Sequence, residues 1–441
     1  MTALRTTSAF PYFALSTVAV AVFLSVSAEM LPTGLLPEMS ADLRVSESLI
    51  GISVSAFAFT VVLTTAVLAK LTRRVPRHAL VVGVLLMLAL STIATAIAPN
   101  YPLLIAARVV GGLAHGLFWA VVCAYAAYLV PKHQVARAVA ITLGGGSLAF
   151  VLGVPLGTAL GHTIGWRASF ALLGVLLIVG AGFVYRFLPR VDHLAAADAS
   201  AIEGDADAAA VSGIPELPRR DHSVMAVVFV CVLAAIIMIG HYSFYTFVAP
   251  YLTKSVGLFG WAVSPALFAF GIAGSLSLVI VGVALARRTR LGLYLALILL
   301  LAAVLMIGIM PGELAVSLPA FLVWGLAIGV VTPLLQTRML HAAPARVRDS
   351  SSAFYATAFN VGIGGGALVG AVLLQKIGLF VLPFFFAAIL LLSIVLLLVS
   401  DAILRQPTGT KHLRFAAWQW TAPLELIYRN WRSDGRPSGS D

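Results

Sequence analysis

The stretch AVFLSVSAEMLPTGLLPEM, residues 21–39, is a long apolar run that is interrupted by one carboxylate, Glu29, with Pro32 and Gly34 shortly after it. The rest of the chain has the same apolar character. Of its 441 residues, 61% are hydrophobic and only 10% are charged, whereas a soluble globular domain carries about 25% charged residues. Because so few charges could not cover a soluble surface, the sequence predicts a protein that crosses a membrane many times.

Apolar runs of about 20 residues, the length needed to cross a bilayer, recur twelve times. The runs are continuous rather than alternating, so they predict helices and not the strands of a barrel. We therefore expect an all-α membrane protein with twelve transmembrane helices. The expected spans are 11–36, 48–70, 78–98, 101–129, 136–160, 167–188, 224–252, 262–286, 291–310, 314–339, 350–375 and 379–401. One alternative is that the first run, with Arg5 before it, is a cleaved signal peptide.

The loops between these spans alternate in charge. The positive-inside rule then places the basic loops and both termini in the cytoplasm, in a multi-pass protein of the bacterial inner membrane. The net charge of +11 is explained by this topology and does not indicate nucleic-acid binding. The basic loops contain Lys70, Arg73, Arg74, Arg77, Lys132, Arg137, Arg287, Arg288, Arg290, Arg346 and Arg348.

Residues 190–222 differ from the rest in composition, with seven acidic residues and two prolines. Such a segment is typical of a flexible linker. It divides the chain into an N-terminal six-helix half, 1–189, and a C-terminal six-helix half, 223–402. The tail, 403–441, either lies on the inner membrane face or is disordered.

The two halves repeat each other. GLAHG at 112–116 matches GLAIG at 325–329, an offset of 213 residues. The same offset pairs Pro131 with Pro344, Gly153 with Gly366 and Gly157 with Gly370. Two parallel repeats around a central site are the architecture of a secondary transporter.

Several motifs carry a resemblance to a known family. They are AEMLPTGLLPEMSADLRVS in span 1, RVVGGLAHG in span 4, GVPLGTALGHTIGWRASF from span 5 into span 6, YTFVAPYL in span 7 and FNVGIGGGALVG in span 11. With these motifs the chain resembles the major facilitator superfamily, in its twelve-span drug:proton antiporter group and the branch of sugar-efflux and chloramphenicol-resistance exporters. The resemblance implies two six-helix pseudo-repeats around a central cavity, and export by proton antiport through alternating access.

The chain departs from the family pattern in the loop between spans 2 and 3. The stretch AVLAKLTRRVPRHAL keeps the basic cluster, Arg73, Arg74 and Arg77, but has Lys70 about where the family has an aspartate. The family's charge latch between the halves is therefore in doubt, and whether Lys70 replaces its function stays open.

Glu29 is the only one of the 17 acidic residues that lies well within an expected span. A charge near the bilayer centre costs about 2.5–3.5 kcal/mol on insertion scales, so it requires a reason. Arg108 in span 4 is expected at a similar depth. We interpret Glu29 as the carrier of the coupling proton, or as a binder of cationic cargo, with Arg108 nearby. The alternative is a fixed ion pair that only joins spans 1 and 4.

His115 lies seven residues after Arg108 and so on the same helical face. It could join a proton relay or could simply be hydrogen-bonded. In span 5, Gly144, Gly153 and Gly157 allow close helix contact and Pro155 bends the span. The resemblance implies that this is the antiporter motif, which shapes the closing of the cavity; ordinary small-residue packing is the alternative.

Candidate cargo contacts come from spans 7, 10 and 11. They are His241, Tyr242, Tyr245, Gln336 and Asn360. Aromatic residues spaced in this way could equally be packing residues. Because the second half has no well-buried charge, we expect a neutral or lipophilic cargo.

Other classes of chemistry lack support in the sequence. Cys123 and Cys231 are single residues in separate spans, so they predict neither a disulfide framework nor a metal site. The sequence contains no phosphate-binding loop of the kind that would indicate ATP as the energy source, and no cofactor is expected. We therefore expect a monomeric, non-enzymatic exporter whose partners are a small molecule, protons and the bilayer. The alternatives are a facilitator or proton-coupled importer of the same fold, and a membrane sensor that transports nothing.

Overall fold

The computed structural model describes residues 10–131, 134–191, 222–281, 285, 288–342 and 348–405. These residues are nearly all helical, and no strand occurs among them. Twelve of the helical stretches are long and apolar enough to cross a membrane. The predicted fold class, with a helix at each of the twelve expected spans, is therefore confirmed.

The helices of the first part of the chain are α1 (Tyr12–Gly34), α2 (Leu36–Leu43), α3 (Glu47–Leu71), α4 (Arg77–Ile97), α5 (Tyr101–Tyr128), α6 (Val135–Leu148), the π-helical turn η2 (Ala149–Gly153), α7 (Val154–Ile164) and α8 (Trp166–Phe187). Those of the second part are α10 (His222–Tyr245), α11 (Val248–Lys254), α12 (Gly260–Ile280), α13 (Thr289–Ile309), α14 (Leu314–Ala342), α15 (Arg348–Lys376) and α16 (Val381–Arg405).

Three expected spans are interrupted. The first ends at Gly34, and α2 starts at Leu36 with a proline in its first turn, where the missing N–H costs nothing. The seventh breaks after Tyr245, before α11. The fifth contains the π-helical turn η2 directly before Pro155, which lies in the first turn of α7. Pro155 lacks the N–H that would bond the carbonyl of Val151 within η2.

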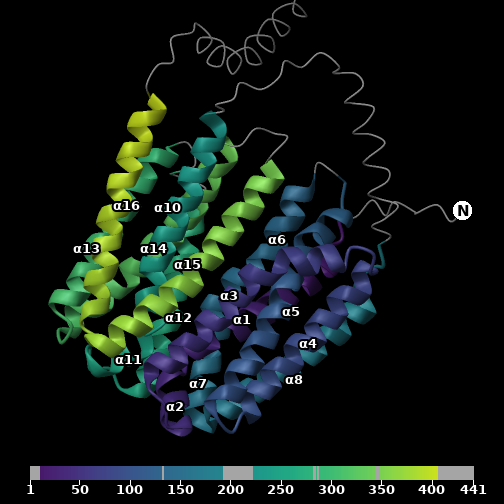
Figure 1. Ribbon diagram of the computed structural model, residues 1–441, viewed down its shortest axis with the longest axis horizontal. Helices are drawn as coiled ribbons and strands as arrows, with labels where there is room; N and C mark the ends of the chain where they lie inside the picture. Colours follow the sequence, from purple (N-terminus) through teal and green to yellow (C-terminus); the bar gives the residue numbers. More distant parts are fainter. Residues whose placement is uncertain are drawn as a thin grey trace, which may run out of the picture. The chain divides into compact units, whose positions relative to one another are not determined.

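Helices from the two parts of the sequence pack against one another. The contact of α3 with α15 is extensive, and α12 packs along η2 and α7. At one end, α11 contacts α1 and α2 (Figure 1). Buried apolar side chains from both parts form one continuous core.

The chain forms two compact units, residues 1–397 and 398–441, and everything described below lies in the first unit. The predicted linker 190–222 lies outside the described residues except for residues 190, 191 and 222. The predicted tail 403–441 lies outside them beyond residue 405. The division into halves 1–189 and 223–402 stays a prediction.

The orientation in the membrane is open to a direct test. We expect a reporter enzyme fused at residue 205 to be active only when it is of the type that works in the cytoplasm. The linker lies two spans away from the basic loops at 130–137 and 287–290, and so on the same side of the membrane. Fusions of a cytoplasmic and a periplasmic reporter at the same position give the measurement. A periplasmic signal at residue 205 would overturn the assigned topology.

Candidate functional site

Glu29 lies in the buried middle of the first half and is 5% exposed. Its Oε2 atom is 3.3 Å from Nε2 of His115 on α5. The imidazole has two further partners: Nδ1 is 2.8 Å from the hydroxyl of Ser25, and Nε2 receives the indole N–H of Trp119 at 2.8 Å. The histidine expected in a relay is therefore the direct neighbour of the carboxyl group.

Arg108 lies near Glu29, as expected, but binds its backbone and not its carboxyl group, so the fixed side-chain ion pair given as the alternative is not seen. Its Nη1 and Nη2 atoms donate to the backbone carbonyls of Ala28 and Glu29 at 2.8 and 2.7 Å, and its guanidinium lies over the ring of Phe57. The reason is in α1: Pro32 has no N–H, so the carbonyl of Ala28, four residues earlier, loses its helical donor. Arg108 supplies that donor and joins α5 to α1.

Two polar atoms in this cluster make no hydrogen bond with any described residue. They are Oε1 of Glu29 and Nε of Arg108, and both are buried. A buried carboxylate oxygen without a donor is costly. The cluster of Ser25, Glu29, Arg108, His115 and Trp119, called the acid cluster below, thus leaves one carboxyl oxygen free.

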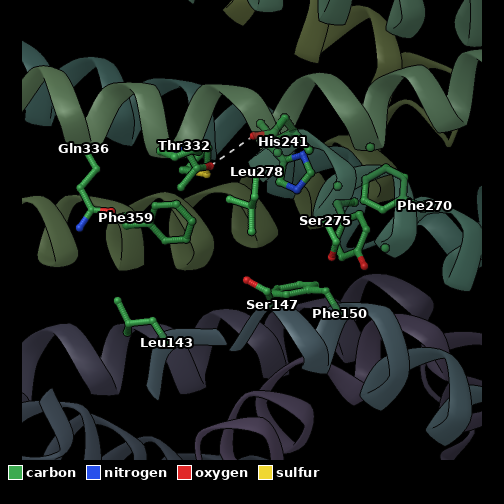
Figure 2. A pocket seen from close by; sticks show the side chains of 18 of the residues that line it. Leu143, Ser147, Phe150, His241, Phe270, Ser275, Leu278, Thr332, Gln336 and Phe359 are labelled. Atoms are coloured by element: carbon green, nitrogen blue, oxygen red, sulfur yellow. Dashed lines mark hydrogen bonds between the residues drawn. The ribbon is translucent and has the colours of Figure 1, made fainter. Parts of the chain in front are cut away.

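A cavity of about 410 Å³ opens between α6 and η2 on one side and α10, α12, α14 and α15 on the other. Figure 2 shows Leu143, Ser147 and Phe150 facing His241 and Thr332 across it. The described lining residues include no Lys, Arg, Asp or Glu. They are Ala140, Leu143, Gly144, Ser147, Phe150, Met238, His241, Tyr242, Tyr245, Phe270, Gly271, Gly274, Ser275, Leu278, Gly325, Ile328, Gly329, Thr332, Pro333, Gln336 and Phe359.

Four of the five predicted cargo contacts line this cavity: His241, Tyr242, Tyr245 and Gln336. Asn360 does not. Its amide donates to the carbonyl of Ala356 in its own helix, and the neighbouring Phe359 faces the cavity instead.

Tyr242 relates the cavity to the acid cluster. It lines the cavity, and its phenol lies within electrostatic range of Glu29. Glu29, Arg108 and His115 are not among the lining residues.

The residues of the expected conformational motif lie at helix contacts. A Cβ atom at Gly153 would be 2.0 Å from the hydroxyl of Ser27, and one at Gly157 would be 2.4 Å from Cδ1 of Leu31. The carbonyl of Pro155 accepts a hydrogen bond from Ser264 on α12 at 2.6 Å. Gly144 differs, because nothing lies near its missing Cβ and it faces the cavity.

The basic cluster lies between α3 and α4. Arg73 and Arg74 are exposed, and Arg77 is the first residue of α4. At the other end of α3, the ammonium group of Lys254 on α11 is 2.7 Å from Glu47. This ion pair connects the two parts of the sequence.

Sequence reasoning missed four residues of the site: Ser25, Phe57, Trp119 and Trp324. The indole of Trp324 donates to Nδ1 of His241 at 3.1 Å. One of the four carried a usable signal, since Trp119 follows His115 by four residues and residues so spaced are neighbours on a helix. The others meet their partners through tertiary packing.

Twelve described helices long and apolar enough to cross a membrane, around a cavity lined from both parts of the sequence, are the arrangement of a multi-span membrane transporter. The chain belongs to the Major Facilitator Superfamily, whose family model matches residues 18–367. The family places it among transporters rather than enzymes and confirms the resemblance found in the sequence.

Relatives with assigned names agree with the predicted branch. A probable sugar efflux transporter of Mannheimia succiniciproducens is 28% identical over 373 residues, which are 83% of this chain and 88% of the relative. A chloramphenicol efflux pump of Mycobacterium tuberculosis is 32% identical over 371 residues, 82% of this chain and 86% of the relative.

Solved structures share the fold. The crystal structure of a D-xylose–proton symporter has a TM-score of 0.69 and 15% identity, and covers 88% of this chain and 97% of its own. A bacterial homologue of the human lysosomal transporter Spinster, in an inward-facing and occupied conformation, has a TM-score of 0.66 and 14% identity, with 89% and 96% covered.

Proposed function

We propose that the chain is a proton-coupled antiporter that exports small neutral or lipophilic molecules across the bacterial inner membrane. The observation that carries the proposal is the contact between the Glu29 carboxyl group and His115. It provides a buried group that can hold a proton, next to a cavity that contains no charge.

The hydrogen bonds of His115 support a proton on Glu29. An indole N–H is a donor only, and an unprotonated ring nitrogen offers one lone pair. Because Trp119 donates to Nε2, that nitrogen acts as an acceptor. A carboxylate oxygen 3.3 Å away would be a second acceptor, which repels it. A proton on Oε2 removes the negative charge and with it most of this repulsion, while Trp119 keeps the lone pair of Nε2.

Loss of that proton would change the contacts of α1. An ionised Glu29 would be repelled by Nε2 of His115 and attracted to Arg108, which already binds the adjacent backbone. Because α1 also contacts η2, α7 and α11, a shift of α1 would move these three elements. They form part of the contact between the two parts of the sequence. This is how protonation would bias alternating access.

The cavity supports a neutral cargo that is aromatic or apolar in part. Its polar groups are hydroxyls, an imidazole and an amide, and its apolar wall includes Phe150, Phe270 and Phe359. The names of the relatives, a sugar efflux transporter and a chloramphenicol efflux pump, suggest the compounds to try first.

The packing supports loading from the cytoplasm under the predicted topology. The contacts of α11 with α1 and α2 and the Lys254–Glu47 pair then lie at the outer end. The cavity residues Ala140 and Gln336 lie toward the inner ends of their helices. Such a state accepts cargo from inside the cell.

Counterflow in proteoliposomes tests the proposal. Purified protein is reconstituted and given labelled chloramphenicol and a panel of sugars, with and without an imposed pH gradient. We expect at least one compound to move uphill, against its own gradient, toward the acidic compartment, and a protonophore to abolish this movement. Movement in the same direction as the protons would indicate symport, and movement that ignores the pH gradient would indicate a facilitator; either result overturns the proposal.

A further inference from the structure

His241 on α10 forms part of the cavity wall and is held on several sides by aromatic rings. It is 6% exposed. It stacks on Tyr245 with ring centroids 5.2 Å apart and planes inclined by 18°. Tyr242, Trp324 and Phe386 meet it edge-on at 4.8, 5.6 and 6.0 Å. The ring therefore has little freedom to turn.

One nitrogen of this ring has a donor as its partner. The indole N–H of Trp324 points at Nδ1 at 3.1 Å, and Trp324 is fully buried. Because indole can only donate, Nδ1 must carry the lone pair. In a neutral imidazole the proton is then on Nε2. A doubly protonated ring would place two N–H groups head to head.

The other nitrogen is available to the cavity. Nε2 of His241 makes no hydrogen bond with any described residue. It is also not one of the fully buried, unpaired side-chain atoms in the described part of the chain, so it is accessible from the cavity. His241 lines the cavity (Figure 2). An N–H group is thus directed at whatever the cavity holds, and such a donor is most stable when it meets an acceptor.

We propose that Trp324 is a positioning residue that keeps His241 neutral with its proton on Nε2. Through this N–H, the cavity selects neutral cargo that carries an oxygen acceptor, a carbonyl or hydroxyl, beside an aromatic or apolar face. The proposed selection of cargo rests on the proposed transport function, whereas the proposed protonation state of the His241 ring does not.

The apolar face of the cargo has matching surfaces on both walls. Phe150 on η2 lies 6.4 Å from Tyr245, which in turn lies 5.4 Å from Phe270, between ring centroids. All three rings line the cavity that the Nε2–H group faces. A flat molecule with an oxygen at its edge would meet rings on its faces and the N–H at that edge.

The two halves use the same pair of residue types differently. In the acid cluster, Trp119 donates to His115 beside a carboxyl group. At His241, Trp324 donates to an imidazole that no described acidic residue contacts. The first arrangement handles a proton and the second offers a fixed donor.

The state of the ring is measured by NMR of purified protein with ¹⁵N-labelled histidine, in which His241→Gln identifies the signal. We expect an Nε2–H tautomer with Nδ1 as acceptor, unchanged in Trp261→Phe, whose tryptophan is exposed on α12. In Trp324→Phe, which keeps an aromatic ring but has no N–H, the Nδ1 signal should shift and both tautomers should appear. An Nδ1–H tautomer in the unaltered protein, or no response to Trp324→Phe, would overturn the proposal.

The cargo class is measured with two probes. Chloramphenicol has carbonyl and hydroxyl oxygens beside an aromatic ring, whereas toluene has the ring alone. We expect chloramphenicol to move the Nε2 signal of His241 and toluene to leave it in place. Trp324→Phe and His241→Phe should each weaken chloramphenicol binding about 3- to 10-fold, the worth of one hydrogen bond. If chloramphenicol leaves the Nε2 signal in place, or if the variants weaken the binding of both probes equally, the proposed cargo selection is wrong. If the movement of cargo is not coupled to the pH gradient, only the proposed transport function is wrong.

Discussion

Glu29→Gln should leave the protein inserted and folded but abolish accumulation of cargo against its gradient. The glutamine amide keeps the size of the side chain and, like a protonated carboxyl group, places no negative charge beside Nε2 of His115. It cannot ionise. A proton that moves inward gains about 2.3 kcal/mol per 100 mV, enough at 1.4 kcal/mol per tenfold for a gradient of about 50-fold. The variant should lose all of this gradient.

The measurement is cargo-induced proton flux in proteoliposomes at equal protein content. Glu38→Gln is the matched control: Glu38 on α2 contacts His162 at 2.8 Å and is partly exposed, and its loss should leave flux almost unchanged. Downhill exchange of neutral cargo should survive in Glu29→Gln. Proton flux equal to that of the unaltered protein would exclude Glu29 as the carrier.

Gly271→Leu should stop transport by preventing the closure of α12 on the first half. A Cβ atom at Gly271 would be 2.6 Å from the carbonyl oxygen of Phe150 and 2.7 Å from Cα of Val151. Both are backbone atoms of η2, so they cannot rotate away. Overpacking of this kind costs about 1–3 kcal/mol, or roughly 5- to 150-fold in the equilibrium between closed and open states.

Gly83→Leu on α4 serves as the control, because nothing lies near its missing Cβ. Turnover is compared at equal membrane content, and labelling of a cysteine at Thr253 on α11 reports opening at that end. We expect lost turnover and faster labelling for Gly271→Leu alone. Normal turnover in a stably inserted Gly271→Leu protein would show that this contact can separate without cost.

The fold was predictable because a bilayer constrains length and polarity together. Each span had to be an apolar run of about 20 residues, and the twelve runs needed no knowledge of their neighbours. The breaks were less visible. Hydropathy marks neither the π-helical turn η2 nor the stop after Tyr245. The only local signals are Pro155 and Pro250, which lack the N–H that would bond the carbonyls of Val151 and Thr246.

The sequence predicted which residues form the site better than it predicted the contacts between them. Glu29 stood out because a lone buried carboxyl group is expensive, and His241 and Gln336 because polar residues in spans are few. The sequence could not show that Arg108 serves the backbone freed by Pro32 while His115 takes the carboxyl group. That choice depends on rotations about helix axes, as does the meeting of Trp324 with His241.

The turn η2 sets the rotational register between the two parts of one span, α6 and α7. A π turn holds one residue more than the α turn it replaces, and each residue of an α-helix advances the face by about 100°. Upstream of η2, Gly145 faces Ala19 on α1 while Ser147 faces the cavity; downstream, Gly157 faces Leu31 on α1. Conservative substitutions of the half-buried Val151 and Leu152 would therefore be tolerated far better than loss of one residue from this turn. A deletion would rotate every later residue of the span by about 100°, so that each side chain would face a new neighbour. The number of residues in this turn is therefore constrained more tightly than the identity of most of them.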